Sequence, residues 1–194
     1  MKSVKIEGKS RSGLGKKETR ALRSEGNVPA VIYGGTDTVH FSAPAIVFRS
    51  LVFTPDFQIA EITVEGKTYR TILKDKQFDV ITDELSHIDF LELVEDKQVV
   101  ATLPLKYEGQ PEGVKAGGRL EIKVKSLKVR TYPKHLSENI VVNISDLQLN
   151  ANIRVEDVVA PNMEIMNSPR IPIASVVMTR ALKQAENEDA KGKK

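Results

Sequence analysis

The strict alternation of polar and apolar residues is the feature that most constrains the fold of this chain. Residues 119–125, RLEIKVK, alternate without a break. Successive side chains of a β-strand point to opposite faces, so this run predicts a strand with one buried and one wet face. Other strand-like runs lie at 4–7, 38–41, 58–64, 87–93, 98–107 and 140–144. Together these runs predict a mainly β protein.

One tight hairpin and two helices are expected among the strands. Glu65 and Gly66 separate two strand-like runs, and Gly supplies the positive φ that such a turn requires. Residues 16–25 contain good helix formers and end at Gly26, a natural residue to follow a helix. Residues 43–53 place apolar side chains close to helical spacing, with a proline suited to the first turn.

The length of 194 residues allows two domains, each with its own core. A polar cluster at 95–97 interrupts two strand-like regions. We therefore expect an N-terminal domain at 1–92 and a second, mainly β domain at 93–182. Residues 183–194 are polar, and we expect them to be a disordered tail.

Several functional classes lack their sequence signatures. The chain contains no cysteine and no apolar run near the roughly 20 residues of a membrane helix, and residues 1–10 lack the apolar core expected of a signal peptide. Neither GLGKK at 13–17 nor GVKAGG at 113–118 completes a phosphate-binding loop, and G-x-S-x-G and H-E-x-x-H are absent. We expect a cytoplasmic protein that is not an enzyme and has no metal, cofactor, membrane contact or small-molecule substrate.

Positive charge is concentrated at the N-terminus. Residues 1–24 carry eight Lys or Arg against two Glu, whereas residues 25–91 carry five basic residues against ten acidic ones. Such local asymmetry indicates a polyanionic partner better than the net charge of +3 does.

The basic residues of the first expected helix share one of its faces. Lys16, Arg20 and Arg23 follow helical spacing, and Arg11 precedes the helix beside a glycine-containing loop. This face could be an ordinary solvated surface or a contact for phosphates. His87 and Asp89 lie two apart on an expected strand and therefore share a face. Aromatic residues are 5% with no tryptophan, which disfavours stacking of single-stranded bases.

Four segments resemble one family of ribosomal proteins. Residues 10–35, SRSGLGKKETRALRSEGNVPAVIYGG, resemble the opening of the bacterial large-subunit proteins that bind 5S ribosomal RNA, and HIDF at 87–90 fits the end of their RNA-binding domain. Residues 104–120 and 136–150 resemble the additional C-terminal domain of the long form, called the general stress protein or CTC family. The resemblance covers residues 1–180.

The resemblance implies a fold and a set of RNA-binding positions. The expected fold is an N-terminal antiparallel β-barrel with a few short helices, followed by a second mainly β domain. The same barrel type occurs in the anticodon-binding part of glutaminyl-tRNA synthetase, so the fold alone does not settle the function. By motif, the RNA-binding positions are Arg11, Lys16, Lys17, Arg20, Arg23, Tyr33, Gln77, His87 and Asp89, where Lys16 and Lys17 could exchange roles.

The function implied is that of a structural component of the large ribosomal subunit. Its N-terminal domain would bind 5S ribosomal RNA through the minor groove and the phosphates, next to other components of the subunit. We expect the protein to be monomeric when free and ribosome-associated in the cell. The alternative is a stress-response protein that acts through a protein partner of the C-terminal domain. Basic residues of that domain, at 123, 125, 128 and 130, could contact RNA or form only a wet face. We favour the wet face, or a contact with a neighbouring ribosomal protein.

Overall fold

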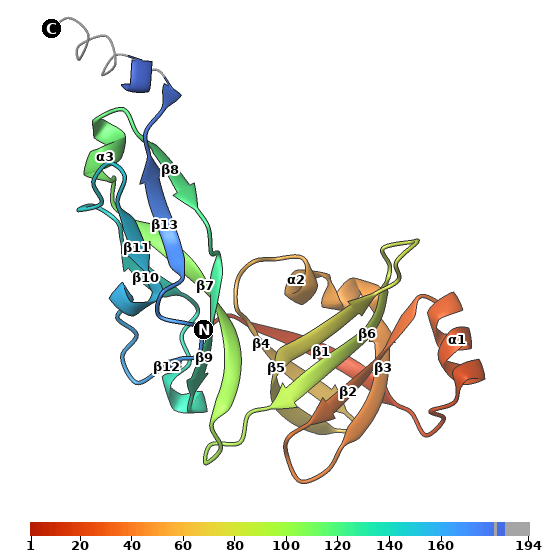
Figure 1. Cartoon of the computed structure of the whole chain (residues 1–194). Helices are drawn as coiled ribbons and strands as arrows, with labels where there is room; N and C mark the ends of the chain where they lie inside the picture. The colour runs from red at the N-terminus through yellow and green to blue at the C-terminus, as the bar shows by residue number, and fades with distance from the viewer. Residues whose placement is uncertain (181, 185–194) are drawn as a thin grey trace, which may run out of the picture. The chain divides into compact units, whose positions relative to one another are not determined.

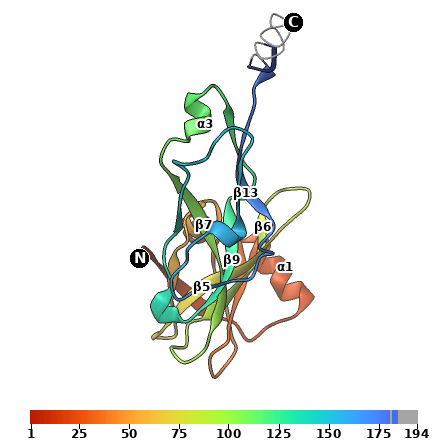
Figure 2. The ribbon, with the colours of Figure 1, turned by 60° about the vertical axis from the view of Figure 1, so that its left-hand side comes forward.

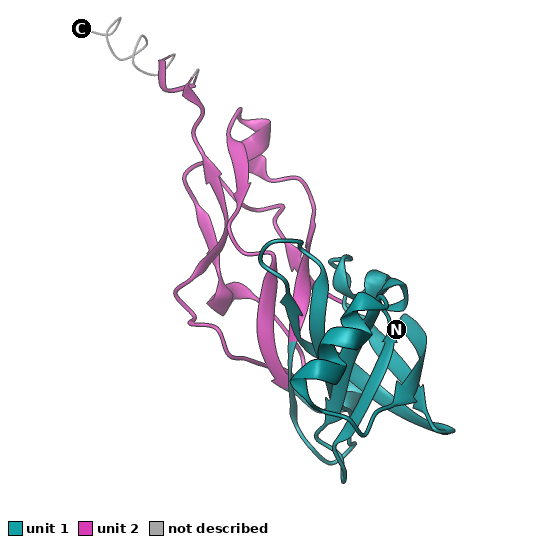
Figure 3. Ribbon diagram, turned by 90° about the vertical axis from the view of Figure 1, so that its right-hand side faces the viewer, with its two compact units in different colours: residues 1–101, 131–138 teal, residues 102–130, 139–194 magenta. Residues whose placement is uncertain are grey.

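The computed structural model describes residues 1–180 and 182–184, and it divides into two compact units (Figure 3). The first unit contains Met1–Ala101 and Thr131–Glu138, and the second contains Thr102–Arg130 and the described residues from Asn139 onward. Both units consist mainly of strands, as the sequence predicts. The expected tail at 183–194 lies outside the described residues from residue 185 onward.

Six strands of the first unit close into a barrel in the order β1-β3-β2-β6-β5-β4 (Figure 1). β1 pairs with β4 in parallel, and β2 pairs with β6 in parallel, whereas the other neighbours are antiparallel. The barrel is therefore mixed, where the resemblance implied an antiparallel one. Its strands are β1 (Ser3–Ser10), β2 (Asn27–Tyr33), β3 (Val39–Pro44), β4 (Ile59–Val64), β5 (Lys67–Phe78) and β6 (Leu85–Glu92).

Three phenylalanine rings occupy the centre of the barrel core. Phe41, Phe48 and Phe90 are each 0% exposed, with ring centroids 6.0 to 6.5 Å apart. A Cβ atom at Gly8 of β1 would lie 2.4 Å from Cδ2 of Phe41. Only glycine therefore lets β1 pass this close to the aromatic centre.

The helix predicted at residues 16–25 is present as α1 (Lys16–Ser24). It lies outside the barrel wall in both ribbon views (Figures 1 and 2) and buries none of its residues. Gly26 follows it with a φ of 79°. The helix predicted at residues 43–53 is shorter than expected. A 3₁₀ turn, η1 (Ala45–Phe48), leads into a single α-helical turn, α2 (Arg49–Val52). This segment buries Leu51 and Val52 in the barrel core.

The predicted hairpin joins β4 to β5 through a two-residue turn. Glu65 has a φ of 50° and Gly66 a φ of 81°. Positive φ at both central residues is the type I′ pattern, whose twist matches that of the flanking strands. The register of β4 against β5 is continuous from Val64–Lys67 to Ile59–Ile72.

A later segment of the chain belongs to the first unit. It includes the 3₁₀ turn η2 (Pro133–His135) and ends at Glu138. The amino group of Met1 lies 3.2 Å from Oε1 of Glu138, which also accepts the backbone amide of Lys2 at 2.7 Å. These two partners lower the pKa of Glu138. Lys134 forms a further ion pair with Glu95 at 3.4 Å.

The second unit contains two small sheets. One has the order β10-β7-β9-β12 and the other the order β11-β13-β8. Their central residues are Leu103, Leu127, Val129 and Ile173, each 0% exposed. The elements are β7 (Val99–Glu108), α3 (Glu112–Lys115), β8 (Arg119–Ile122), β9 (Ser126–Thr131), β10 (Ile140–Asn143), β11 (Asn152–Arg154), η3 (Val155–Asp157), β12 (Glu164–Ile165) and β13 (Pro172–Val177).

The alternating run at 119–125 forms a strand only over its first four residues, β8. The amides of Lys123 and Val124 both donate to the carbonyl of Ile173, at 2.8 and 3.2 Å. Two consecutive donors on one acceptor interrupt the ladder, so β8 ends at Ile122. Ile122 is 46% exposed, and the prediction of a buried face on this run was therefore wrong. Lys123 and Lys125 lie between β8 and β9 rather than within one strand.

The aromatic centre gives a test of the barrel core. We expect Phe90→Ala to lower the free energy of unfolding of the first unit by about 3–5 kcal/mol, because a large cavity would replace a ring at full burial. Phe53→Ala is the matched control, since Phe53 is 64% exposed, and it should cost about 1 kcal/mol or less. Urea denaturation followed by circular dichroism measures both, and equal losses would contradict this account of the core.

Candidate nucleic-acid interface

Outward polar side chains of β2, β6 and β5 lie on one outer face of the barrel, which we call the polar surface although Val31 and Leu91 also face this way. Ile32 of β2 and both Ile88 and Phe90 of β6 are buried. Because side chains alternate along a strand, Tyr33, His87 and Asp89 face the opposite way, away from the core. The parallel pairing of β2 with β6 places these outward residues on neighbouring strands.

A β-bulge decides which side chains of β5 join this surface. Leu73 pairs with Phe90, but the next pair is Asp75 with Asp89, so Lys74 is an extra residue. The extra residue shifts the alternation by one. Asp75 and Gln77 therefore face outward beside Asp89 and His87. Lys76 pairs with the buried Ile88, and its ammonium donates to the carbonyl of Val52 at 2.7 Å.

His87 and Asp89 form a close pair within this surface. Nδ1 of His87 lies 2.8 Å from Oδ1 of Asp89, and the two side chains are 28% and 29% exposed. In this arrangement Nδ1–H donates to the carboxylate, which fixes the tautomer of a neutral imidazole. Nε2 is then an acceptor for a ligand, and the second oxygen of Asp89 is another.

Tyr33 lies in the electric field of the same carboxylates. Partial burial raises the pKa of Tyr33 most, and the negative charges of Asp89 and then Asp75 raise it further. The phenol therefore stays protonated at neutral pH and can donate a hydrogen bond. Asp75 is a member of this surface that sequence reasoning missed. The register of β5 against β6 would have shown that Asp75 faces outward. The bulge that sets this register cannot be read from the sequence.

Helix α1 places its cations beside the polar surface. Lys16, Lys17, Arg20 and Arg23 are all exposed. Nε of Arg23 donates to the carbonyl of Ser86 at 3.0 Å, which fixes the C-terminal end of α1 against β6. Ser86 is itself an extra residue in the ladder, since Gln77 pairs with His87 and Phe78 with Leu85. The carbonyl of Ser86 is therefore available to accept the hydrogen bond from Arg23.

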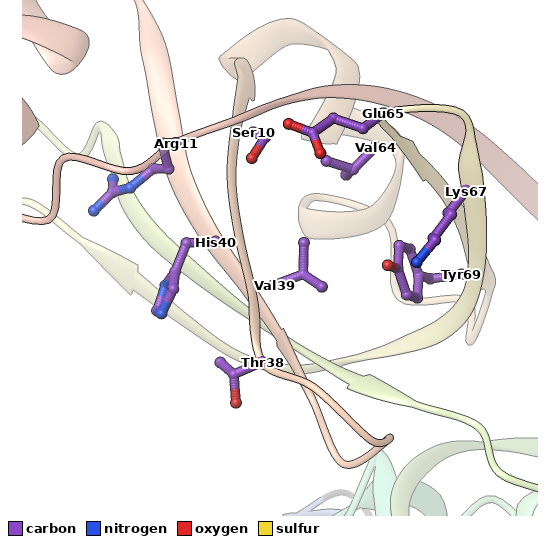
Figure 4. Close-up of a pocket in the computed structure, with 9 residues that line it drawn as sticks. All are labelled: Ser10, Arg11, Thr38, Val39, His40, Val64, Glu65, Lys67 and Tyr69. Carbon is purple, nitrogen blue, oxygen red and sulfur yellow. The ribbon is translucent and has the colours of Figure 1, made fainter.

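Arg11 lies before α1, next to a pocket at the barrel's edge (Figure 4). Its backbone amide donates to the carbonyl of His40 at 3.1 Å. Nε and Nη1 of its guanidinium are buried and have no hydrogen-bond partner among the described residues. The pocket has a volume of about 330 Å³ and is lined by Ser10, Arg11, Thr38, Val39, His40, Val64, Glu65, Lys67 and Tyr69.

The nine residues singled out in the sequence therefore fall into three groups. Tyr33, Gln77, His87 and Asp89 lie together on the outer face of β2, β5 and β6. The four cations of α1 lie on the adjoining helix, and Arg11 lies before it, where β1 ends. His40 and Lys67, which share the pocket with Arg11, are basic residues that sequence reasoning did not select.

Two other kinds of feature are absent from residues 1–180 and 182–184. No group of three or more histidine, cysteine or acidic side chains there is arranged to hold a metal ion. None of the helices in the same part of the chain is long and apolar enough to cross a membrane.

Comparison with known proteins gives two family matches and close relatives. Residues 6–90 match the ribosomal L25p family, and residues 98–180 match the C-terminal domain of ribosomal protein TL5. The large ribosomal subunit protein bL25 of Cytophaga hutchinsonii is 41% identical over 98% of this chain and 100% of its own length. The proteins of the same name from Amoebophilus asiaticus and Parabacteroides distasonis are 40% and 36% identical, over 100% and 96% of this chain and 100% and 98% of their own lengths.

The environment of Tyr33 gives a test of the polar surface. We expect Asp89→Asn to lower the pKa of Tyr33 toward its ordinary value of 10.0, because a negative charge that opposes ionisation is removed. Asp75→Asn should lower it less. Glu7→Gln on β1 is the control and should leave it unchanged. An NMR titration of the Tyr33 ring measures its pKa in the three variants. An unchanged Tyr33 pKa in Asp89→Asn would show that the Asp89 carboxylate does not act on the Tyr33 phenol.

Proposed function

This chain belongs to the ribosomal L25p family, in the long form with a TL5-type C-terminal domain, and from that premise we propose that it binds 5S ribosomal RNA as a component of the large ribosomal subunit. The family is one of ribosomal proteins and not of enzymes. The observation that supports this proposal most is that the exposed cations of α1 lie beside the polar outer face of β2, β5 and β6. The site of action is then the ribosome in the cytoplasm.

The cations are suited to the sugar-phosphate backbone. An A-form helix presents phosphate ridges on either side of a wide, shallow minor groove, and proteins recognise it largely by shape and backbone contacts. Lys16 and Arg20 lie along one face of an exposed helix and can follow such a ridge. Arg11 lies just before this helix, and guanidinium groups bind phosphate bidentately.

The strand surface is suited to base edges and 2′-hydroxyls. Asp89 and Nε2 of His87 accept hydrogen bonds, the phenol of Tyr33 donates one, and the amide of Gln77 does both. A carboxylate next to phosphates is repelled unless it meets a donor. Base amino groups and 2′-hydroxyls are the donors that a minor groove offers. The cations therefore position the RNA, and the strand residues recognise it.

The RNA-binding part is assigned to the N-terminal domain, expected at residues 1–92. The match of the L25p family to residues 6–90 supports this assignment, and the match of the TL5-type domain begins only at residue 98. Arg11, α1 and the strand surface all lie within the first range. The domain at 93–182 is proposed to contact a neighbouring component of the subunit.

The dependence of binding on salt tests the role of the cations. If Arg11, Lys16, Arg20 and Arg23 each neutralise a phosphate, affinity for 5S RNA should fall steeply with salt concentration. Each alanine variant should then reduce the log–log slope by about one or less. Lys128→Ala in the second unit is the control. A titration in which all four variants keep the wild-type slope would remove the cations from the interface.

Asp89 gives the sharper test, because electrostatics alone predicts the opposite result. We expect Asp89→Ala to weaken 5S RNA binding by about 1–3 kcal/mol, although it removes a negative charge, because it removes an acceptor for the RNA and frees His87. Asp89→Asn should recover part of the loss. The loss should persist at high salt, unlike that of Arg20→Ala.

The matched control for Asp89 is Glu7→Ala on β1, which removes an exposed carboxylate from another part of the barrel. It should leave affinity unchanged or slightly increase it. Filter binding at two salt concentrations measures the variants. If Asp89→Ala binds as tightly as wild type with its fold intact by circular dichroism, Asp89 has only a structural role.

A further inference from the structure

The turn between β5 and β6 exposes two large apolar side chains. Val80 is 96% exposed and Ile81 is 93% exposed, the highest values among the exposed large hydrophobic residues of the described chain. The hairpin that carries them extends beyond the barrel wall (Figure 1). Single exposed apolar residues are ordinary, but two neighbours at the end of a hairpin form a surface of their own.

Hydrogen bonds within the turn hold these side chains outward. Oδ1 of Asp79 accepts the backbone amides of Ile81 and Thr82, at 2.9 and 3.1 Å. The amide of Asp79 donates to the carbonyl of Glu84 at 2.8 Å, and that of Asp83 donates to the carbonyl of Asp79 at 3.0 Å. A turn fixed in this way loses little conformational entropy when it binds a partner.

The apolar surface continues down the stem of the hairpin. Phe78 directly precedes the turn, is 37% exposed, and lies 6.1 Å from the ring of Phe53, which is 64% exposed. Lys76 lies over the Phe78 ring, with Nζ 5.7 Å from its centroid. The apolar tip is thus Val80 and Ile81, and the apolar stem is Phe78 with Phe53.

The negative charges around the tip indicate which kind of partner it can bind. Asp79, Asp83 and Glu84 flank Val80 and Ile81, and none of the three forms an ion pair with another described residue. Hydrogen bonds from the amides of Ile81 and Thr82 lower the pKa of Asp79, so that its charge is kept at neutral pH. Three carboxylates around an apolar centre repel phosphates and complement lysine and arginine side chains.

We propose that the β5–β6 hairpin tip docks into an apolar socket, bordered by lysine or arginine side chains, on another protein of the large ribosomal subunit. The tip lies next to the proposed RNA surface, because Ser86, two residues after Glu84, accepts the Nε of Arg23 on α1. The partner protein therefore binds beside the RNA. This inference rests on the proposed function, since it places the chain in that subunit.

The experiment compares two affinities of the full-length chain. Large subunits from cells that lack this protein are one target, and isolated 5S RNA is the other. We expect Val80→Ser/Ile81→Ser to weaken binding to the subunits by tenfold or more and to leave binding to 5S RNA unchanged. Val159→Ser is the control, because Val159 is 84% exposed and lies in the second unit.

Two results in this comparison would overturn the inference. If Val80→Ser/Ile81→Ser binds the subunits as tightly as wild type, the tip does not dock into a protein socket. If the variant loses affinity equally for the subunits and for 5S RNA, the tip contacts RNA. If wild type binds the subunits but not 5S RNA, the proposed function fails instead, and the subunit comparison still tests the tip.

A photoreactive amino acid at position 81 identifies the class of partner directly. In intact large subunits, irradiation should join it to one protein, at a segment that contains lysine or arginine. A cross-link to ribosomal RNA, or no cross-link at all, would contradict the proposal. Asp83→Asn/Glu84→Gln tests the charge: it should weaken binding to the subunits severalfold at low salt, and the difference should shrink as salt is added. An unchanged affinity at low salt would contradict the charge complementarity.

Discussion

Strands β2 and β6 lie side by side in parallel register, with Ala30 beside Ile88 and Ile32 beside Phe90, although they are far apart in sequence. Their inward side chains are fully buried, so the pairing is fixed by the core as well as by the backbone ladder. A register change of one residue would turn Tyr33, His87 and Asp89 into the core. The outer polar surface, the position of Arg23 against Ser86 and the closure of the barrel all depend on this pairing.

Two irregularities in the β5–β6 ladder complete the arrangement. The extra residue Lys74 turns Asp75 and Gln77 to the outside, and the extra residue Ser86 leaves a carbonyl for Arg23. Bulges commonly re-aim side chains or end pairing near functional sites. Here they give one hairpin outward polar side chains on its outer face, an anchor for α1 and, beyond both, an exposed apolar turn.

The first unit combines opposite charges within one region. The cations of α1 attract a polyanion from any direction, but attraction of this kind does not distinguish one RNA helix from another. Acceptors such as Asp89 are unfavourable near phosphates and become favourable only where a donor meets them. The carboxylates around Val80 and Ile81 would limit the proposed RNA surface at this side, because they disfavour phosphates next to an apolar tip.

The mainly β class, helix α1, the turn at Glu65–Gly66 and the clustering of cations before residue 24 could all be predicted from the sequence, because they depend on local periodicity, turn geometry and composition. Its resemblance to a ribosomal family also selected the residues of the polar surface other than Asp75. The sequence pattern did not predict the parallel pairs of the barrel, the outward direction of Asp75 and Gln77, the end of β8 at Ile122 or the place of residues 131–138 in the first unit. Each of these depends on pairing between distant segments, and an inserted residue or a shared carbonyl such as that of Ile173 changes the register without changing the local pattern.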